Sequence, residues 1–464
     1  MSAQACGDAR CARRLSEHLL ASLLIGETPT ITNLICAHAG QHRDWTAAYR
    51  LYSQGRVDEG VLFDRVLDEL LTVLPDHEPM VIALDDTLIR KRGTKINGVS
   101  WRRDPLGPPF QTNLVRAQRF LQMSAAWPLG EGQARMVPIL FHHAPSAQKP
   151  VKNASPEQLS WQREEQKQRR LNAQALEQMK LLRERCPSTR SMIFCGDGSY
   201  TNTTIVKNLP EHCTYIGRIR KDAKLHHPPA LQEGKPNGRP RCYGPAAATP
   251  EQLRTDDTQP WQSVRAFAAG REHDIRIKTL DHVLWRKTGT RQTYRVIVIA
   301  PLGYRLTKGA KLLYRAPAYL ICTDPNLPIE TLVQAYLWRW GIEVNFREEK
   351  TLLGVGEAHV RTAASNQHLP AVMVAAYALL WTAALRMHKL NTLPRVLARP
   401  KWRRKTKELS LLPSTGELLR TLRTEVWSRA LRPASLAHFV TTPSALTKSQ
   451  KPSPCLASML FCAA

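Results

Sequence analysis

The stretch YLWRWGIEVNFREEK, residues 336–350, is the most informative segment of this 464-residue chain. An α-helix advances by about 100° per residue, so five polar side chains of this segment fall along one stripe of its surface. They are Tyr336, Arg339, Glu343, Arg347 and Lys350. One carboxylate is thus flanked by cations and a phenol on a single face, which favours a functional site. A solvated helix face with ordinary Glu–Arg pairs four residues apart is the alternative.

Two other regions place carboxylates directly after short apolar runs. Met80–Leu84 (MVIAL) ends in Asp85 and Asp86, and Ser191–Cys195 (SMIFC) is followed by Asp197 between two glycines. Short unbroken apolar runs are typical of buried strands. The sequence therefore predicts acids at the carboxyl ends of two strands, and the predicted helix adds Glu343.

Three carboxylates at the ends of elements suit hard divalent cations, because Mg²⁺ and Mn²⁺ prefer oxygen ligands. A pair of such ions can activate an attacking oxygen and stabilise the leaving oxygen of a phosphodiester. We therefore expect phosphoryl transfer on DNA, in which positioning and charge stabilisation supply most of the rate. The cations Arg339 and Lys350 would then hold phosphates.

The remaining elements follow from apolar periodicity and capping residues. Residues 1 to about 75 are predicted to be helical. A charged helix is predicted from Pro156, capped by Ser155, to about Arg185. The other predicted elements are an edge or irregular strand at 136–141 with Pro138 inside it, strands at 294–300 and 318–322, a helix from near Pro328 to near Gly354, and a buried core helix at 369–385.

The composition points to a polyanionic partner. Lys and Arg number 66 against 39 Asp and Glu, which leaves a net charge of +27. Such an excess favours a nucleic acid, or less strongly an anionic membrane surface, over a basic protein without such a partner. Ten cysteines without a CxxC motif argue against zinc ligation and a disulfide scaffold. The N-terminus lacks the apolar core of a signal peptide, so we expect a cytoplasmic protein.

The sequence resembles the DDE transposases of bacterial insertion sequences. Residues 336–350 keep every spacing of the Y-x2-R-x3-E-x6-K signature of one group, often called the insertion-sequence-four family. The segments ALDDTLIR (83–90) and IFCGDGSYTN (193–202) look like the regions that carry the two aspartates of that family. The resemblance covers roughly residues 80 to 390.

The resemblance implies an α/β fold with a ribonuclease-H-like catalytic core, formed by residues 76–222 and 312–392. A mostly β insertion would occupy residues 223–311, where Trp285 would either pack internally or stack on a displaced base. An α-helical N-terminal region, residues 1–75, would bind DNA ends, and residues 393–464 would form a basic C-terminal extension. By analogy, the protein would act as a homodimer on double-stranded DNA, with no small-molecule substrate and no membrane, in the bacterial cytoplasm at the nucleoid.

The implied chemistry is cutting and joining of DNA. Two Mg²⁺ ions, with Mn²⁺ as a substitute, would be held by Asp86, Asp197 and Glu343. The protein would nick DNA at terminal inverted repeats and join the ends to a target. The side chains that would contact DNA are Tyr336, Arg339, Arg347 and Lys350.

Two questions stay open at the level of the sequence: which aspartate is the ligand, and which function the protein has. Only one of the adjacent Asp85 and Asp86 can face the metal from a strand. Asp86 is favoured because it precedes Thr87, as the aspartate of the family commonly precedes threonine, and Asp85 is the alternative. A metal-dependent nuclease that does not join strands, and an inactive DNA-binding protein derived from a transposase, are the alternative functions.

Overall fold

The computed structural model describes residues 2–430, apart from residues 27, 94, 105–106, 109–112, 148–149, 151, 230–241, 291, 306–308 and 394–411. The basic segment 401–407 of the predicted C-terminal extension lies outside the described residues. Of that extension, the structure describes mainly helix α12 (Thr415–Ala430).

The N-terminal region is helical, as the sequence predicts. It contains α1 (Ala9–Leu24), α2 (Ile31–Ala37), the 3₁₀ helix η1 (Gly40–His42), α3 (Thr46–Ser53) and α4 (Glu59–Val73). The side chains of Asp8, Thr30 and Asp58 cap three of these helices by accepting hydrogen bonds from backbone N–H groups. Apolar faces of these helices join the main core, so the N-terminal region packs directly on the sheet and on α11 (Ala363–Lys389).

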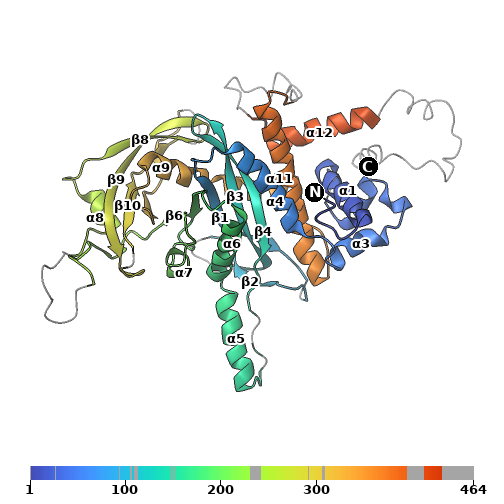
Figure 1. Ribbon diagram of the computed structural model, residues 1–464, viewed down its shortest axis with the longest axis horizontal. Coiled ribbons are helices and arrows are strands. Elements are labelled where there is room, and N and C mark those ends of the chain that lie inside the picture. The colour runs from blue at the N-terminus through green and yellow to red at the C-terminus, as the bar shows by residue number, and fades with distance from the viewer. Residues whose placement is uncertain are drawn as a thin grey trace.

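A mixed sheet of ribonuclease-H-like order forms the centre of the molecule (Figure 1). Three antiparallel strands, β4 (Gln133–His143), β3 (Leu114–Gly130) and β1 (Met80–Arg90), are followed by β5 (Met192–Gly196) and β6 (Cys213–Arg218), which run parallel to β1. The short β2 (Ser100–Arg103) pairs with the start of β3. This arrangement, with helices on its faces, confirms the predicted fold class.

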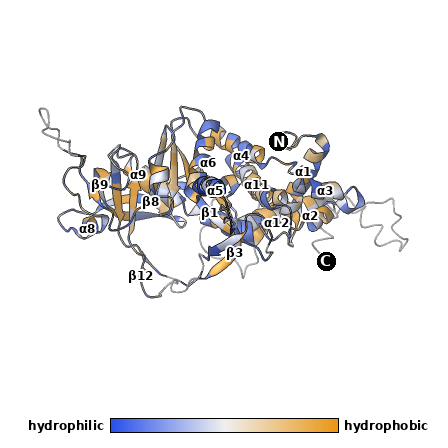
Figure 2. Ribbon diagram, turned by 90° about the horizontal axis from the view of Figure 1, so that it is seen from below, coloured by the Kyte–Doolittle hydropathy of each residue, from blue (hydrophilic) through white to orange (hydrophobic). Residues whose placement is uncertain are grey.

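The β-rich residues between Asp197 and Glu343 extend the same sheet. Beyond β6 lie β13 (Ala318–Cys322), β10 (Tyr294–Ile299), β9 (Arg271–Trp285) and the short β7 (Leu225–His226), with β8 (Gln262–Ala268) paired to β9. The small elements of this part of the chain are α7 (Thr203–Val206), α8 (Pro250–Thr255), β11 (Gly303–Tyr304) and β12 (Leu313–Tyr314). Hydrophobic residues colour much of β8, β9 and α9 (Ile329–Trp338) in Figure 2, where the helix covers these strands.

Helix α11 crosses the molecule as a core helix, as predicted for residues 369–385. It is long and apolar enough to span a membrane by length and composition, but 78% of its most apolar 18-residue window is buried inside the protein. Pro370 lies in its second turn. The helix packs against α4 and β4 and supplies a continuous part of the main hydrophobic core.

Two predicted helices are each interrupted. The predicted helix from 156 to 185 divides into α5 (Pro156–Gln168) and α6 (Leu171–Arg185), because Arg170 adopts an extended backbone conformation. The predicted capping box at Ser155 and Gln158 is present, and α5 projects from the body of the protein (Figure 1).

The signature segment also bends, although its helix begins after Pro328 and ends before Gly354 as predicted. Helix α9 ends at Trp338, and α10 (Gly341–Leu352) begins three residues later. A Cβ atom at Gly341 would lie 2.3 Å from Cγ of Met136 in β4. The bend therefore lets the segment follow the sheet, and the glycine allows a close approach that a larger residue would block.

The strand that carries Asp85 and Asp86 is longer than predicted. It continues to Arg90, because β3 pairs with it from Ile82 to Arg90. The parallel partner β5 pairs with β1 only as far as Ala83. The two aspartates therefore lie in the middle of β1, just past the point where its ladder with β5 ends.

Candidate active site

Strand register decides which aspartate faces which side of the sheet. Val81 and Ala83 belong to the hydrophobic cluster under α9, whereas Ile82 and Leu84 belong to the main core on the other face. Because side chains alternate along a strand, the side chain of Asp85 lies on the face under α9, and that of Asp86 lies on the face of the main core. Ala83 pairs with Cys195 in the parallel ladder, so Asp85 and Asp197, each two residues further along, come alongside one another.

Arg339 joins two of the carboxylates. Its Nη1 lies 3.6 Å from Oδ2 of Asp85, and its Nη2 donates a hydrogen bond of 3.1 Å to Oε1 of Glu343. The guanidinium carbon lies 5.7 Å from the ring centroid of Tyr336. The structure thus gathers Tyr336 and Glu343 of the predicted stripe, together with Asp85, around the guanidinium of Arg339.

The pKa of Asp85 reflects this crowding. It is raised to about 7, chiefly by burial and also by the negative charges of Asp197 and Asp86, while a backbone N–H and Arg339 oppose the rise. A site that collects this much negative charge favours a bound cation.

Asp197 is held in place by the turn that follows β5. Its Oδ1 accepts hydrogen bonds from the N–H of Ser199 at 2.8 Å and from the Ser199 hydroxyl at 2.6 Å. A Cβ at the preceding Gly196 would lie 2.4 Å from Oη of Tyr215, so only glycine fits there. The Oδ2 atom accepts no hydrogen bond from the described part of the chain, which leaves it available to a ligand.

Asp86 has a different environment on the opposite face. The Tyr200 hydroxyl donates a hydrogen bond of 2.8 Å to its Oδ1. Burial raises the pKa of Asp86, and the negative charge of Asp197 acts in the same direction, while this hydrogen bond and the positive charges of Arg119 and Arg102 oppose the rise. Local sequence does not identify Tyr200, Arg102 and Arg119 as neighbours of Asp86, because other elements of the chain carry them.

The other two predicted DNA contacts lie further along α10. Arg347 is exposed, and Lys350 is half-buried. Burial lowers the pKa of Lys350, with the charge of Arg90 acting in the same direction and Glu349 opposing it. Arg90 follows Asp86 on β1, so cations from two elements meet beside the end of α10.

The carboxylates of the candidate site form a partial ligand set for a divalent cation. Among the described residues, no group of three His, Cys, Asp or Glu side chains is close enough together to hold a metal ion, and Arg339 lies between Asp85 and Glu343. The donors are nevertheless all carboxylate oxygens, and Asp85 and Asp197 concentrate negative charge on one face. Asp85 and Asp197 therefore fit an Mg²⁺-type ion, while Glu343 would join them only if Arg339 moved.

Two of the three buried residues of α10 are polar, which is unusual for a helix that covers a sheet; the third is Ile342. Asn345 and Glu349 are 0% and 2% exposed. Asn345 donates a hydrogen bond of 3.0 Å to Ser124 of β3, and Gln122 of the same strand donates one of 3.0 Å to Glu349. These bonds fix the rotation of α10 and so direct Glu343 toward Arg339 and Asp85.

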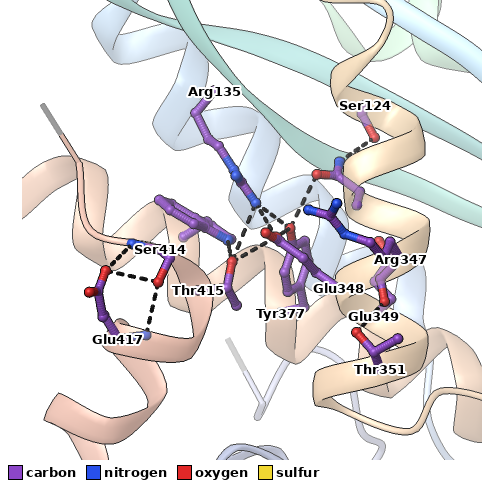
Figure 3. A network of polar contacts seen from close by, with 12 residues as sticks. Ser124, Arg135, Arg347, Glu348, Glu349, Thr351, Tyr377, Ser414, Thr415 and Glu417 are labelled. Atoms are coloured by element: carbon purple, nitrogen blue, oxygen red, sulfur yellow. Dashed lines mark hydrogen bonds and ion pairs between the residues drawn. The ribbon is translucent and has the colours of Figure 1, made fainter. Parts of the chain in front are cut away.

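A second set of contacts ties α10 to three other elements (Figure 3). Glu348 forms an ion pair with Arg135 of β4 and accepts hydrogen bonds of 2.7 Å from the hydroxyls of Tyr377 in α11 and Thr415 in α12. The guanidinium of Arg135 also lies 3.8 Å from the ring centroid of Trp381. The described part of the C-terminal extension is therefore joined to the helix that carries Glu343.

The buried Glu349 predicts a pH dependence of stability. Burial raises its pKa to about 8, from an ordinary value of 4.5, although Gln122 and Lys350 oppose this. A carboxyl group whose pKa is higher in the folded state stabilises the fold fully below pH 4.5, and this contribution is lost as the pH rises through about 8. We therefore expect the free energy of unfolding of Glu349→Gln, relative to that of the native protein, to be higher at about pH 9 than at about pH 5 by a few kcal/mol.

Urea denaturation of both proteins at the two pH values measures this gain. If the free energies of unfolding of Glu349→Gln and the native protein differ by the same amount at both pH values, Glu349 keeps an ordinary pKa.

The mixed sheet and the helices on its faces have the ribonuclease-H-like fold. The model of the family described as DDE superfamily endonuclease matches residues 6–293, and the chain belongs to this family. Its members act on DNA and generally use divalent metal ions. The match includes Asp85, Asp86 and Asp197 but ends before Glu343. The comparison with curated proteins finds no match.

Proposed function

We propose that the protein is a DNA transposase, which nicks element ends at terminal inverted repeats and joins them to target DNA. The observation that carries this proposal is the cluster in which Arg339 joins Glu343 to Asp85, beside Asp197, at the centre of the sheet. The complete signature around Glu343 favours a transposase over a nuclease that does not join strands, because the resemblance to transposases rests on it. The protein would work as a homodimer on nucleoid DNA in the cytoplasm.

For the metal ligands we propose Asp85, Asp197 and Glu343, with Asp85 in the place first expected for Asp86. Asp85 lies on the face of Arg339 and Glu343, whereas Asp86 accepts its hydrogen bond from Tyr200 on the other face. Two Mg²⁺ ions, or Mn²⁺ in their place, would polarise the attacking and leaving oxygens of the phosphodiester. Tyr336, Arg339, Arg347 and Lys350 would hold the DNA backbone at the cut.

The first test is cleavage of DNA taken from the ends of the gene's own locus. The purified protein is incubated with Mg²⁺, with Mn²⁺ or with EDTA, beside Asp197→Asn, and products are followed by strand and by joining to a plasmid. We expect metal-dependent nicking and joining that Asp197→Asn abolishes, with binding in EDTA preserved. Nicking without joining would identify a nuclease instead, and binding without cleavage in either metal would identify an inactive DNA-binding protein.

Removal of the two signature cations is expected to weaken phosphate binding. Arg339→Ala and Lys350→Ala should each reduce the slope of log affinity against log salt by about 0.9, the value for one phosphate contact on duplex DNA. Lys180→Ala is a matched control, because Lys180 is exposed on α6. Binding is measured by fluorescence anisotropy in EDTA across a range of NaCl concentrations, and an unchanged slope would show that these side chains are structural.

A further inference from the structure

A cation-lined cavity of about 570 Å³ adjoins the turn that holds Asp197. Gly198 and Thr201 of that turn form one wall. The second wall is the turn between β6 and β7, residues 218–224, and the third is the turn after β9, residues 285–287. The size falls within the range of about 300 to 1,000 Å³ that is typical of ligand sites.

The charges that line this cavity are almost all positive. Its exposed cations are Arg218, Arg220, Lys224, Arg286 and Lys287. The one acid that lines it, Asp222, is already bound by Arg220 through two hydrogen bonds of 2.9 and 2.8 Å. The other four cations form no ion pair with a carboxylate of the described chain, so the cavity offers unneutralised positive charge to an anion.

The walls of the cavity are held together by backbone pairing. The N–H of Arg286 donates a hydrogen bond of 3.1 Å to the carbonyl of Lys224, and Leu225 pairs with Trp285 across β7 and β9. Trp285 is only 6% exposed and packs edge-on against Tyr294. Trp285 thus builds the floor, and the cations stand on turns whose relative position is fixed before any ligand arrives, which lowers the entropy lost on binding.

The cavity lies beside the candidate active site, because Gly198 in its lining is adjacent to Asp197 in the chain. Burial raises the pKa of Tyr336, and the charges of Arg339 and Arg218 oppose that rise, so Arg218 lies near the first residue of the signature. A DNA strand held at Asp85 and Asp197 would therefore have its neighbouring phosphates within reach of this cavity.

We propose that the cavity binds the sugar–phosphate backbone of the cut DNA strand, beside the phosphate held by the carboxylates. The inference rests on the proposed function for the position of that strand. Arginine and lysine are suited to phosphate oxygens, and backbone contacts carry no sequence information. The subsite would position every DNA end equally and leave sequence recognition to other parts of the protein.

The test compares two double variants of the full-length protein. In Arg286→Ala/Lys287→Ala, both cations of one wall are removed. In the control, Arg265→Ala/Arg271→Ala, two exposed cations are removed from the opposite end of the β8–β9 hairpin. Affinity for a labelled duplex from the ends of the locus, and for one of scrambled sequence, is measured in EDTA against NaCl concentration.

We expect the slope of log affinity against log salt to fall by about 1.8 in the cavity variant, for two phosphates, and to stay unchanged in the control. The loss of affinity should be equal for both DNA sequences. A slope equal to that of the native protein in the cavity variant would overturn the proposal. The charge-reversal variant Arg286→Glu/Lys287→Glu should bind DNA still more weakly. If this variant binds DNA as tightly as the native protein, the proposal is also overturned.

A second measurement locates the contact on the DNA. Neutral methylphosphonates replace the phosphates next to the cut, and the affinity of native protein and cavity variant is compared. If the cavity contacts those phosphates, we expect the native protein and the cavity variant to bind the neutral DNA with equal affinity. If the two affinities differ as much as they do on unmodified DNA, the cavity contacts other phosphates. If the native protein cleaves DNA and the cavity variant keeps the native salt slope, the proposed role of the cavity is refuted and the transposase activity is not. If the cavity variant has a reduced salt slope but the native protein cleaves no DNA, the proposed transposase activity is refuted and the role of the cavity is not.

Discussion

Replacing Asp85 with asparagine is expected to lower metal-dependent DNA cleavage on the order of a thousandfold, as loss of a group that stabilises transition-state charge commonly does. Asp86→Asn is expected to retain cleavage within about tenfold of the native rate, because the proposed ligand set places Asp86 outside the metal site, among the groups that support it. The difference follows from strand alternation, which directs Asp85 to Arg339 and Asp86 to Tyr200. Single-turnover cleavage at saturating DNA measures both rates.

Tyr200→Phe provides a matched control for the role of Asp86. It removes the hydrogen bond to Asp86 and leaves Asp85 and Asp197 in place. We expect it to lower the free energy of unfolding by about 1 kcal/mol, the net worth of a typical hydrogen bond, and to keep cleavage. Loss of cleavage in Asp86→Asn together with full activity of Asp85→Asn would reverse the proposed ligand assignment.

The second large effect is expected at the contacts of Glu348. Glu348→Ala should lower the free energy of unfolding by about 3 kcal/mol or more, because it leaves Arg135 largely buried without its carboxylate. The side chains of Arg135 and Glu348 are only 18% and 12% exposed. The Thr415 hydroxyl would lose its acceptor as well, so the attachment of α12 to α10 would weaken.

Urea denaturation measures this change, and two further variants interpret it. Arg135→Leu/Glu348→Leu should recover part of the loss, because apolar groups of similar size can replace a buried pair. Glu164→Ala breaks an ion pair on α5 whose side chains are 66% and 57% exposed, and should cost less than about 1 kcal/mol. A cost for Glu348→Ala as small as that of Glu164→Ala would show that water enters around Arg135.

Several features of the fold follow from local sequence alone. They depend on residues within a few positions of each other. Examples are the capping box at Ser155, the helices of the N-terminal region, and the strands that precede the Asp85–Asp86 pair and Asp197. Strand β3 was not predicted. Both of its faces are buried, and the polar residues Gln118, Gln122 and Ser124 interrupt its apolar residues, so it lacks the unbroken apolar run by which a central strand is identified.

The buried polar residues of α10 could not be predicted for the same reason. Asn345 and Glu349 look like residues of a solvated face, and only their hydrogen bonds to β3 show that they are buried. The Arg135–Glu348 pair joins residues 213 positions apart. Contacts of this kind depend on how elements pack, and local periodicity does not contain that information.

The sequence by itself determined the residue types of the site and their grouping: a complete signature around Glu343, an adjacent aspartate pair after one apolar run, and Asp197 after another. The tertiary structure decided which aspartate of the pair meets the signature. A shift of one residue in a strand moves a side chain to the opposite face of the sheet. The face that each aspartate occupies is set by the pairing of β1 with β3 and β5 and by the position of α9 and α10 over one side.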